Sequence, residues 1–294
     1  MSLYRAPAAA GAFLLALLLP GCAPADEADP AVAPSGSASA SAAACAPTDL
    51  KTKTAGTLTI GTDKPAYAPW FQDDDPTNGK GFESAVAYAV AGQLGYDKAA
   101  VKWVTATFNS VIQPGTKPYD MDINQFSITP ERQQAVDFSS GYYDVSQAVV
   151  TIKGSKAAGV TTLAGLTPLK IGAQVGTTSY KAVTDVIKPT SDPKVFDDND
   201  KAKLALSNGQ IDALVVDLPT ALYLAAADLK DGMVVGQLPP TTSGTIEQFG
   251  IVLEKGSSLT SCVSQAVDSL RTDGTLKTLE TTWLTEAAGA PLLK

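Results

Sequence analysis

Histidine is absent from this 294-residue chain. Its absence excludes Ser–His and Cys–His nucleophilic dyads, histidine general bases and histidine metal ligands. Basic residues are also scarce, because 22 Lys and Arg face 30 Asp and Glu and leave a net charge of −8. No basic run is dense enough for the footprint of a nucleic-acid-binding protein. We therefore expect no metal, no cofactor and no nucleic-acid partner. Without histidine chemistry, a non-enzymatic function is favoured over an enzyme.

Long apolar runs are missing as well, apart from Ala8 to Leu19, which is too short to span a membrane permanently. With Arg5 before it, this run predicts a secretory signal over residues 1–22. Leu19-Pro20-Gly21-Cys22 then resembles a bacterial lipoprotein box, in which the cysteine is lipidated and becomes the mature N-terminus. Pro20 departs from the small or β-branched residue usual there, so the alternative is plain secretion with cleavage nearby.

Residues 23–44 consist mainly of Ala, Pro, Ser and acidic residues and hold almost no large apolar group. Such a segment cannot bury enough surface to fold. A flexible tether of this length would reach roughly 25 Å. We expect an exported protein that is lipid-anchored through Cys22 to the outer face of the cytoplasmic membrane.

Only three cysteines are present. With Cys22 reserved for lipid, Cys45 and Cys262 remain as an even pair in an exported chain. We predict a disulfide between them that joins the two ends of the fold. The alternative is a pair of buried thiols.

From Gly56 onward, strand and helix patterns alternate. Strands are expected at 57–62, 101–105, 121–126, 170–175, 211–216 and 249–254, and helices at 82–94, 178–187, 197–207, 219–227 and 259–284, the last with a break at Gly274. This alternation predicts an α/β fold with parallel sheets and helices on both faces. Ligands of such sheets bind beyond the carboxyl ends of the strands.

The segment Ser127-Ile128-Thr129-Pro130-Glu131-Arg132 follows one of these strands. Thr129 suits a helix N-cap, Pro130 the first helical position and Glu131 the first turn. Arg132 does not suit that turn, because a cation lies badly at the positive end of a helix dipole. A bound anion would resolve the conflict, and hydroxyls, free N–H groups and a guanidinium form a carboxylate clamp. The alternative is a capped helix whose arginine points to solvent.

Two further strand-to-helix turns carry polar groups, Gly176-Thr177-Thr178 and Asp217. Each taken alone suits a simple N-cap. Taken together, however, the anion clamp and the carboxylate of Asp217 match the two opposite charges of an α-amino acid zwitterion. Tyr67, Trp70 and Phe108 offer aromatic faces that could enclose its side chain, and packing beneath a loop is their alternative.

With these motifs the chain resembles the polar amino-acid-binding family of extracellular solute-binding proteins, which serve ABC importers. The resemblance covers about Gly56 to Leu284 and is specific in order and spacing. It rests on Gly61-Thr62-Asp63, Gly81-Phe82-Glu83, Ser127 to Arg132, Val136-Asp137-Phe138-Ser139, Gly176-Thr177-Thr178, Asn208 to Ala213 and the region of Trp283.

The resemblance implies a two-lobe periplasmic-binding-protein type II fold in which two crossover strands form the hinge. The crossings should fall near Val149–Ile152 and Gln248–Val252. Residues 46–150, completed by 248–294, would form the first lobe, and 151–247 the second. The Cys45–Cys262 bridge would then lie within one lobe and leave closure free.

The resemblance also implies roles for the α-groups of the ligand. Arg132 would fork onto the α-carboxylate, helped by Ser127 and by Thr178 from the other lobe. Asp217 would take the α-ammonium.

For the ligand side chain, the resemblance implies a sandwich between Tyr67 and Phe108, with Asp63 at the distal end. Gln125 departs from the small residue that the family commonly has, so an amide contact would replace a backbone or hydroxyl contact. Glu83 replaces the usual Asp and Ala85 a second acidic residue, and Glu83 is not assigned to the site.

We therefore expect a monomer that captures a free polar or basic amino acid such as Arg, Lys or Gln and delivers it to an ABC permease. One alternative is a same-fold dehydratase acting on an arogenate- or prephenate-like substrate, with Glu83 or Asp63 as general acid. Aromatic absorbance after incubation with prephenate would reveal that activity. Another is a sensor coupled to a membrane signalling protein, which co-purification with a kinase would favour.

Overall fold

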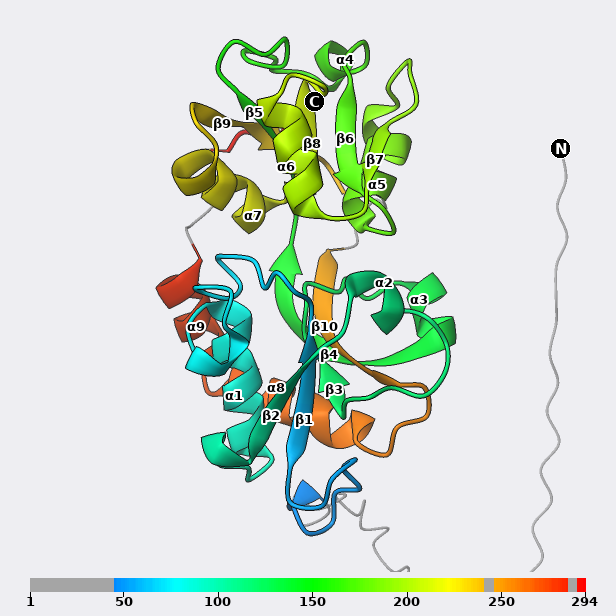
Figure 1. Cartoon of the computed structure of the whole chain (residues 1–294), viewed down its shortest axis with the longest axis vertical. Coiled ribbons are helices and arrows are strands. Elements are labelled where there is room, and N and C mark those ends of the chain that lie inside the picture. Colours follow the sequence, from blue (N-terminus) through cyan, green and yellow to red (C-terminus); the bar gives the residue numbers. More distant parts are fainter. Residues whose placement is uncertain (1–44, 241–245, 285–289) are drawn as a thin grey trace, which may run out of the picture. The chain divides into compact units, whose positions relative to one another are not determined.

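A computed structural model describes residues 45–240, 246–284 and 290–294. The predicted signal peptide, Cys22 and the predicted tether lie outside the described residues. The described chain forms two five-stranded sheets (Figure 1), with strand orders β2-β1-β3-β10-β4 and β7-β6-β8-β5-β9. No helix of the described residues is long and apolar enough to cross a membrane.

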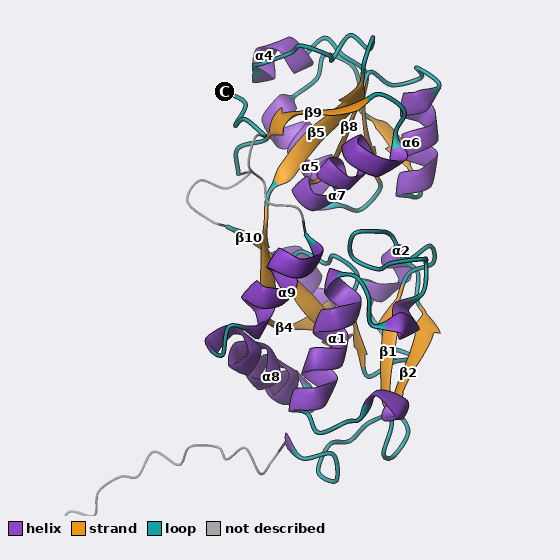
Figure 2. Cartoon of the chain, turned by 90° about the vertical axis from the view of Figure 1, so that its left-hand side faces the viewer, coloured by secondary structure: helices purple, strands orange, loops and turns teal. Residues whose placement is uncertain are grey.

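The first sheet contains β1 as an inner strand, and all five residues of β1 are buried. Its strands are β1 (Leu58–Thr62), β2 (Val101–Thr105), β3 (Met121–Asp122), β4 (Val136–Val145) and β10 (Glu247–Glu254). Three helices that contact one another pack on this sheet (Figure 2): α1 (Phe82–Gln93), α8 (Thr260–Thr272) and α9 (Thr275–Trp283). Their apolar residues share one core with Trp70, Phe71 and Phe249.

The second sheet contains β5 (Gln147–Ile152), β6 (Ile171–Gln174), β7 (Lys194–Phe196), β8 (Ala213–Asp217) and β9 (Gly232–Gln237). Its helices are α4 (Leu163–Leu166), α5 (Thr178–Ala182), α6 (Asn199–Ser207) and α7 (Leu218–Tyr223). Two separate apolar cores form around its strands, one with α5 and one with α6 and α7. The expected helices on both faces therefore occur here.

Shorter elements connect these layers. They are α2 (Phe108–Val111), α3 (Pro130–Ala135), the 3-10 turns Pro76–Asn78 and Lys98–Ala100, and the π turns Val183–Ile187 and Leu224–Asp228. The π turns extend α5 and α7, so the expected helices 178–187 and 219–227 are continuous in backbone but not regular α-helix.

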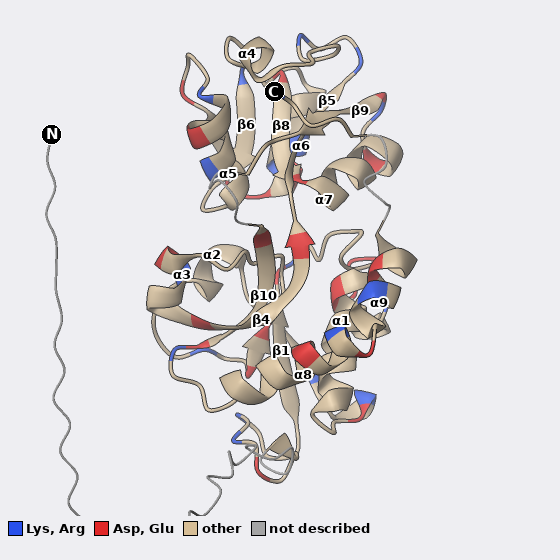
Figure 3. Cartoon of the chain, turned by 180° about the vertical axis from the view of Figure 1, so that it is seen from behind, with Lys and Arg blue, Asp and Glu red and all other residues tan. Residues whose placement is uncertain are grey.

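The chain changes sheets at Ser146, because β4 belongs to the first sheet and β5 to the second. It returns between Gln237 and Glu247, the ends of β9 and β10. Acidic segments mark the end of β4 and the start of β10 in Figure 3. The first crossing thus precedes the expected 149–152, and residues 147–150, expected in the first lobe, lie in the second sheet.

The last residues also differ from expectation. Leu292 bridges to Gln237 of β9, and the buried Leu293 joins a core of the second sheet. Residues 290–294 were expected to complete the first lobe and instead pack on the second sheet.

Both sheets are mixed, whereas the sequence pattern predicted parallel sheets. Strands β1, β2 and β3 are parallel, as are β6, β7 and β8. The strands next to each crossing pair antiparallel to their neighbours, β10 with β3 and β4, and β5 with β8 and β9. The alternation of strands and helices predicts only the parallel part.

The predicted disulfide between Cys45 and Cys262 is confirmed, with a Cα–Cα distance of 5.5 Å. Cys262 lies in α8 and is buried, and Cys45 packs against the same core. Both therefore belong to the first sheet's side of the chain.

Candidate functional site

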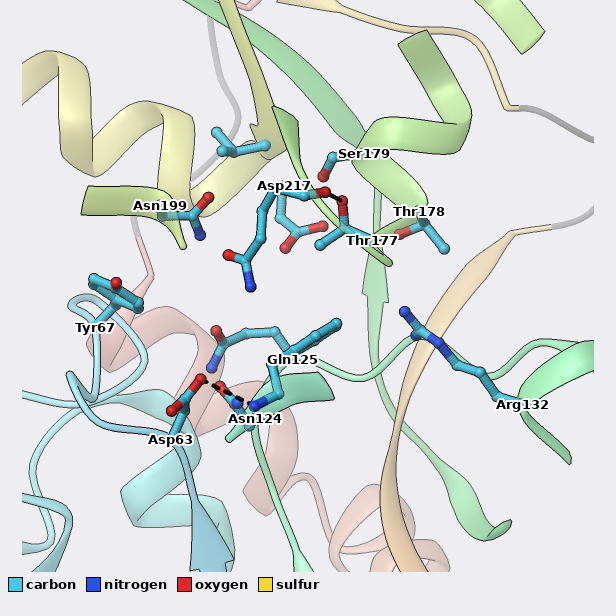
Figure 4. Close-up of a pocket in the computed structure, with 13 residues that line it drawn as sticks. Asp63, Tyr67, Asn124, Gln125, Arg132, Thr177, Thr178, Ser179, Asn199 and Asp217 are labelled. Atoms are coloured by element: carbon cyan, nitrogen blue, oxygen red, sulfur yellow. Dashed lines mark hydrogen bonds between the residues drawn. The ribbon is translucent and has the colours of Figure 1, made fainter. Parts of the chain in front are cut away.

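A pocket is lined by residues from the strand ends and following turns of both sheets (Figure 4). Its lining residues are Asp63, Tyr67, Phe108, Asn124, Gln125, Arg132, Gln174, Thr177, Thr178, Ser179, Asn199, Val216 and Asp217. Seven of the eight residues expected to bind ligand are among them, and Ser127 is the exception. The position beyond the strand ends agrees with the general rule for α/β sheets.

Arg132 lies in the first turn of α3, where Thr129 caps the helix by accepting a hydrogen bond from the Arg132 N–H at 3.2 Å. The guanidinium is buried and faces the pocket, so the alternative in which it points to solvent is wrong. Its Nη1 donates to the Ser127 carbonyl at 2.7 Å and its Nη2 to the Gly176 carbonyl at 3.0 Å. Because a guanidinium has five N–H donors, others remain for an anion.

Aromatic rings hold this guanidinium in place. Phe108 and Phe126 stack with centroids 4.4 Å apart, and Arg132 Cζ lies 5.5 Å and 5.6 Å from the two centroids. Burial lowers the pKa of Arg132 to about 10, so it stays charged at neutral pH. Phe108 therefore supports the arginine, besides lining the pocket.

The hydroxyls expected beside the clamp come together from both sheets. Ser127 Oγ lies 3.1 Å from Thr178 Oγ1 and donates to Glu247 Oε1 at 2.6 Å. Since Ser127 has one hydroxyl proton, Thr178 must be the donor between the two hydroxyls. Thr177, not Thr178, is the N-cap of α5, accepting from the Tyr180 N–H at 3.1 Å.

Asp217 occupies the N-cap position of α7 but makes no side-chain cap. Its Oδ1 instead accepts from Gln147 Nε2 at 2.8 Å, and its carboxylate lines the pocket. Burial, and next the charge of Glu247, raise the pKa of Asp217 to about 8. A half-buried carboxylate that forms no ion pair with a described residue is suited to receive a cation.

Asp63 and Tyr67 lie on the side of the pocket opposite Arg132 (Figure 4). Asp63 accepts the Lys64 N–H at 2.7 Å and the Phe108 N–H at 3.0 Å. Burial raises the pKa of Asp63. The Tyr67 hydroxyl is buried and has no partner among the described residues. Leaving such a group unpaired costs about 1–3 kcal/mol, which a ligand could recover.

Gln125 has φ of 49°, a backbone conformation that is rare for side-chain-bearing residues. This agrees with the small residue expected there. Its backbone N–H donates to Glu83 Oε1 at 2.7 Å, and its Nε2 donates to Glu83 Oε2. Glu83 is fully buried and does not line the pocket. Trp70 is also fully buried, so it packs in the core, which was the alternative to enclosing the ligand side chain.

Several site residues escaped sequence reasoning. The lining also includes Asn124, Gln174, Ser179 and Asn199, and behind it Gln147 and Glu247 bond to Asp217 and Ser127. Asn124 adjoins Gln125, and Asn199 lies in the first turn of the predicted helix 197–207, so position could have indicated both. Nothing local distinguished Gln147 or Glu247, because each begins a strand whose partners are distant in sequence. The described residues contain no group suited to hold a metal ion.

Two sheets linked by two crossings, with pocket groups supplied from both, define a two-lobe binding protein of the periplasmic type II fold. Residues 58–286 match the family of bacterial extracellular solute-binding proteins, family 3, and the chain belongs to that family.

Relatives with assigned ligands are similar over most of the chain. The L-cystine-binding protein TcyJ of Escherichia coli (strain K12) is 30% identical over 79% of this chain and 84% of that protein. The arginine-binding extracellular protein ArtP of Bacillus subtilis (strain 168) is 27% identical over 78% of this chain and 86% of its own.

A solved structure of an ancestral arginine-binding protein bound to glutamine is 31% identical, with a TM-score of 0.65. It covers 79% of this chain and 100% of that one. An amino acid ABC transporter substrate-binding protein from Streptococcus pneumoniae Canada MDR_19A, bound to L-arginine, is 27% identical. Its TM-score is 0.64, and the match covers 79% of this chain and 96% of that chain.

Proposed function

We propose that this protein captures a free amino acid in the pocket, with Arg132 on the α-carboxylate and Asp217 on the α-ammonium. The observation that carries the proposal is a basic and an acidic side chain, Arg132 buried and Asp217 half-buried, that both face one pocket and form no ion pair with a described residue. Ser127 and Thr178 would assist the carboxylate contact. No covalent step is involved.

The side chain of the ligand would be polar or cationic, as in arginine, lysine or glutamine. Once an α-ammonium group ionises Asp217, the charged lining groups are one cation, Arg132, against the carboxylates of Asp63 and Asp217. A net positive ligand would reduce this imbalance, whereas a neutral zwitterion would not. Tyr67 and Phe108 would flank the side chain, and Asp63 would meet its distal end. The names of the relatives, which include arginine and glutamine binders, support this class.

Delivery to an ABC permease is the associated role. Several relatives carry ABC transporter in their names. Since pocket groups come from both sheets, ligand would favour the arrangement in which both contact it, and that difference would drive closure of two lobes. We propose a monomer, anchored through Cys22 at the outer face of the cytoplasmic membrane.

The dehydratase alternative has a structural neighbour in an ancestral amino acid-binding protein, AncCDT-1, described as a precursor of cyclohexadienyl dehydratase, at 30% identity and a TM-score of 0.63. Of the two acids considered, Glu83 does not line the pocket and is bonded to Gln125 and Tyr142. Only Asp63 would remain as general acid. We therefore favour binding without chemistry, and absence of aromatic product from prephenate is the expected result.

A thermal-shift screen tests the proposal. The purified protein, unfolded and refolded to remove bound ligand, is screened against the common amino acids, ornithine and citrulline. Ligand at about 100 times its dissociation constant should stabilise the fold by roughly 2.7 kcal/mol. We expect a raised midpoint with one or a few polar or cationic amino acids. No shift with any amino acid would contradict the proposal.

Calorimetry on Arg132→Ala then tests the assignment of the clamp. We expect a loss of about 2–5 kcal/mol in binding, because the ligand carboxylate would be buried without a partner. Arg271→Ala is the matched control, since Arg271 is exposed in α8. Near-native affinity of Arg132→Ala would mean that the carboxylate binds elsewhere.

A further inference from the structure

Glu83 is a buried carboxylate that the amino-acid contacts leave unexplained. It lies in the first turn of α1, is fully buried and is bonded by two residues of the first sheet's side. Gln125 donates to it through both its backbone and its side chain, and Tyr142 of β4 donates through its hydroxyl. Gln125 lines the pocket and Glu83 does not. The carboxylate therefore touches the pocket only through Gln125.

We propose that Glu83 is a positioning residue: its carboxylate fixes the side-chain amide of Gln125 with the nitrogen held away from ligand and the carbonyl oxygen Oε1 offered to it. The pocket thereby selects ligand side chains that donate hydrogen bonds. This inference rests on the proposed function, because it concerns the selectivity of that same pocket.

The orientation of the amide follows from the donors around Glu83. An ionised carboxylate only accepts, so an amide beside it must present nitrogen. The flipped amide would place Oε1 of Gln125 against a negative oxygen with no proton between them. Gln125 Oε1 accepts no hydrogen bond from a described residue in the observed orientation, which leaves it for a ligand.

The same geometry links the amide to the protonation of Glu83. Oε1 of Glu83 already accepts from the Gln125 N–H and the Tyr142 hydroxyl, so an added proton belongs on Oε2. Oε2 is the atom that faces the Gln125 amide nitrogen. A proton there would turn Glu83 into a donor and reverse the amide, presenting N–H groups to the ligand instead. The charges around Glu83 are Asp122 of β3 and Asp217 of β8, besides the Tyr142 hydroxyl. Burial raises the pKa of Glu83 to about 7.

Arginine and citrulline form a matched ligand pair for the test. They share length and α-groups, but citrulline replaces a donating nitrogen of the guanidinium with an accepting oxygen. Effects on Arg132 or Asp217 therefore cancel in the ratio of the two dissociation constants. In the unsubstituted protein at pH 8 we expect arginine to bind at least about tenfold more tightly, as for a hydrogen bond to a charged group.

Glu83→Gln should reduce that ratio by about tenfold, because a neutral amide at position 83 can either donate or accept. Gln125→Leu should reduce it similarly, and adding Glu83→Gln to Gln125→Leu should change it no further. Tyr142→Phe is the control, since it removes a donor to Glu83 without touching Gln125. Because the hydrogen bond that is lost lowers the pKa of Glu83, this variant should keep the ratio at a pH well above 8, where Glu83 is ionised in both proteins. An unchanged ratio in Glu83→Gln, with arginine still bound, would overturn the inference and leave the proposed function intact.

A ligand-free readout makes the test independent of the ligand's identity. The side-chain amide NMR signals of Gln125, identified by their loss in Gln125→Leu, should move with the titration of Glu83 and should not titrate in Glu83→Gln. Signals of Gln125 that are the same in both proteins from pH 5 to 9 would overturn the inference, whichever amino acid binds.

Discussion

The carboxylates of Asp217 and Glu247 both accept hydrogen bonds from the side-chain amide nitrogen of Gln147. Gln147 Nε2 lies 2.8 Å from Asp217 Oδ1 and 3.3 Å from Glu247 Oε1. No cation of the described residues forms an ion pair with either of them. In the absence of ligand this arrangement favours the protonated form of Asp217, in keeping with its raised pKa. The group proposed to bind an ammonium is thus also a site of electrostatic strain.

We expect Asp217→Asn to stabilise the ligand-free protein at pH 8 and to abolish amino-acid binding. The folded-state pKa of Asp217 is raised from 3.8 to about 8. Its stabilising contribution is therefore complete below the unfolded pKa and is lost as the pH rises through the folded value. The gain in unfolding free energy should be small at pH 4 and roughly 5 kcal/mol above pH 8, because the pKa rises from 3.8 to about 8 on folding. Urea unfolding across this range and calorimetry measure the two effects.

Asp192→Asn is the matched control, because Asp192 is exposed. It should follow the unsubstituted protein at every pH and bind ligand normally. If Asp217→Asn unfolds like the control throughout, Asp217 is not strained in the way that its surroundings indicate.

Individual site residues could be predicted from the sequence where a residue did not suit its neighbours in the chain. Arg132 conflicted with its helix dipole, and Asp217 stood between a strand and a proline, so both could be found from neighbours in the chain. Glu247 and Gln147 could not, because their significance comes from contacts with Ser127 and Asp217, which are 120 and 70 residues away. Whether the predicted residues bind ligand stays a prediction.

Among the elements, α7 and the loop before α1 are joined by one buried hydrogen bond. Trp70 is fully buried, and its indole Nε1 donates to Thr220 Oγ1 at 2.9 Å. Thr220 belongs to the helix that follows β8 of the second sheet, whereas Trp70 packs in the core of the first. This bond is one of the links between the two sheets that need no ligand.

Thr220→Val should lower the unfolding free energy by about 1–3 kcal/mol, because the shape is kept while a buried indole N–H loses its acceptor. Thr281→Val, at an exposed position of α9, is the control and should change stability little. Denaturant unfolding of both variants gives the comparison. Equal stabilities would mean that the indole finds another acceptor.

Helices and strands were predicted correctly where the periodicity of apolar residues along the chain defines them. The prediction failed where a strand is defined by pairing with partners distant in sequence. The strand 101–105 and the helix break at Gly274 were predicted correctly. The strand expected at 121–126 is only Met121–Asp122, and the rest of the expected strand contains a backbone turn at Gln125 with positive φ. The crossing was placed too late because nearly all of β5 is buried, and nothing in such a run tells which sheet it joins.

For the whole molecule, the bridge between Cys45 and Cys262 closes a loop with a sequence separation of 217. Replacing both cysteines with serine should lower the unfolding free energy by about 2–5 kcal/mol, chiefly by freeing the unfolded chain. Amino-acid affinity should stay unchanged, because neither cysteine lines the pocket.

Unfolding curves and calorimetry on the double variant check both parts, and reductant on the unsubstituted protein should reproduce the loss of stability. A variant as stable as the unsubstituted protein would show that the loop is already restrained without the bridge. Weaker binding would show instead that the bridge supports the pocket.

The same bridge has a mechanical consequence. Tension applied to the chain ahead of Cys45 divides there between the peptide backbone and the sulfur bond to α8. Part of the load therefore enters α8, whose apolar face packs on the first sheet, and less of it reaches β1 through the backbone. A pull from the N-terminal side would have to shear the helical layer as a block, and the strand ends that form the pocket would carry little of the force.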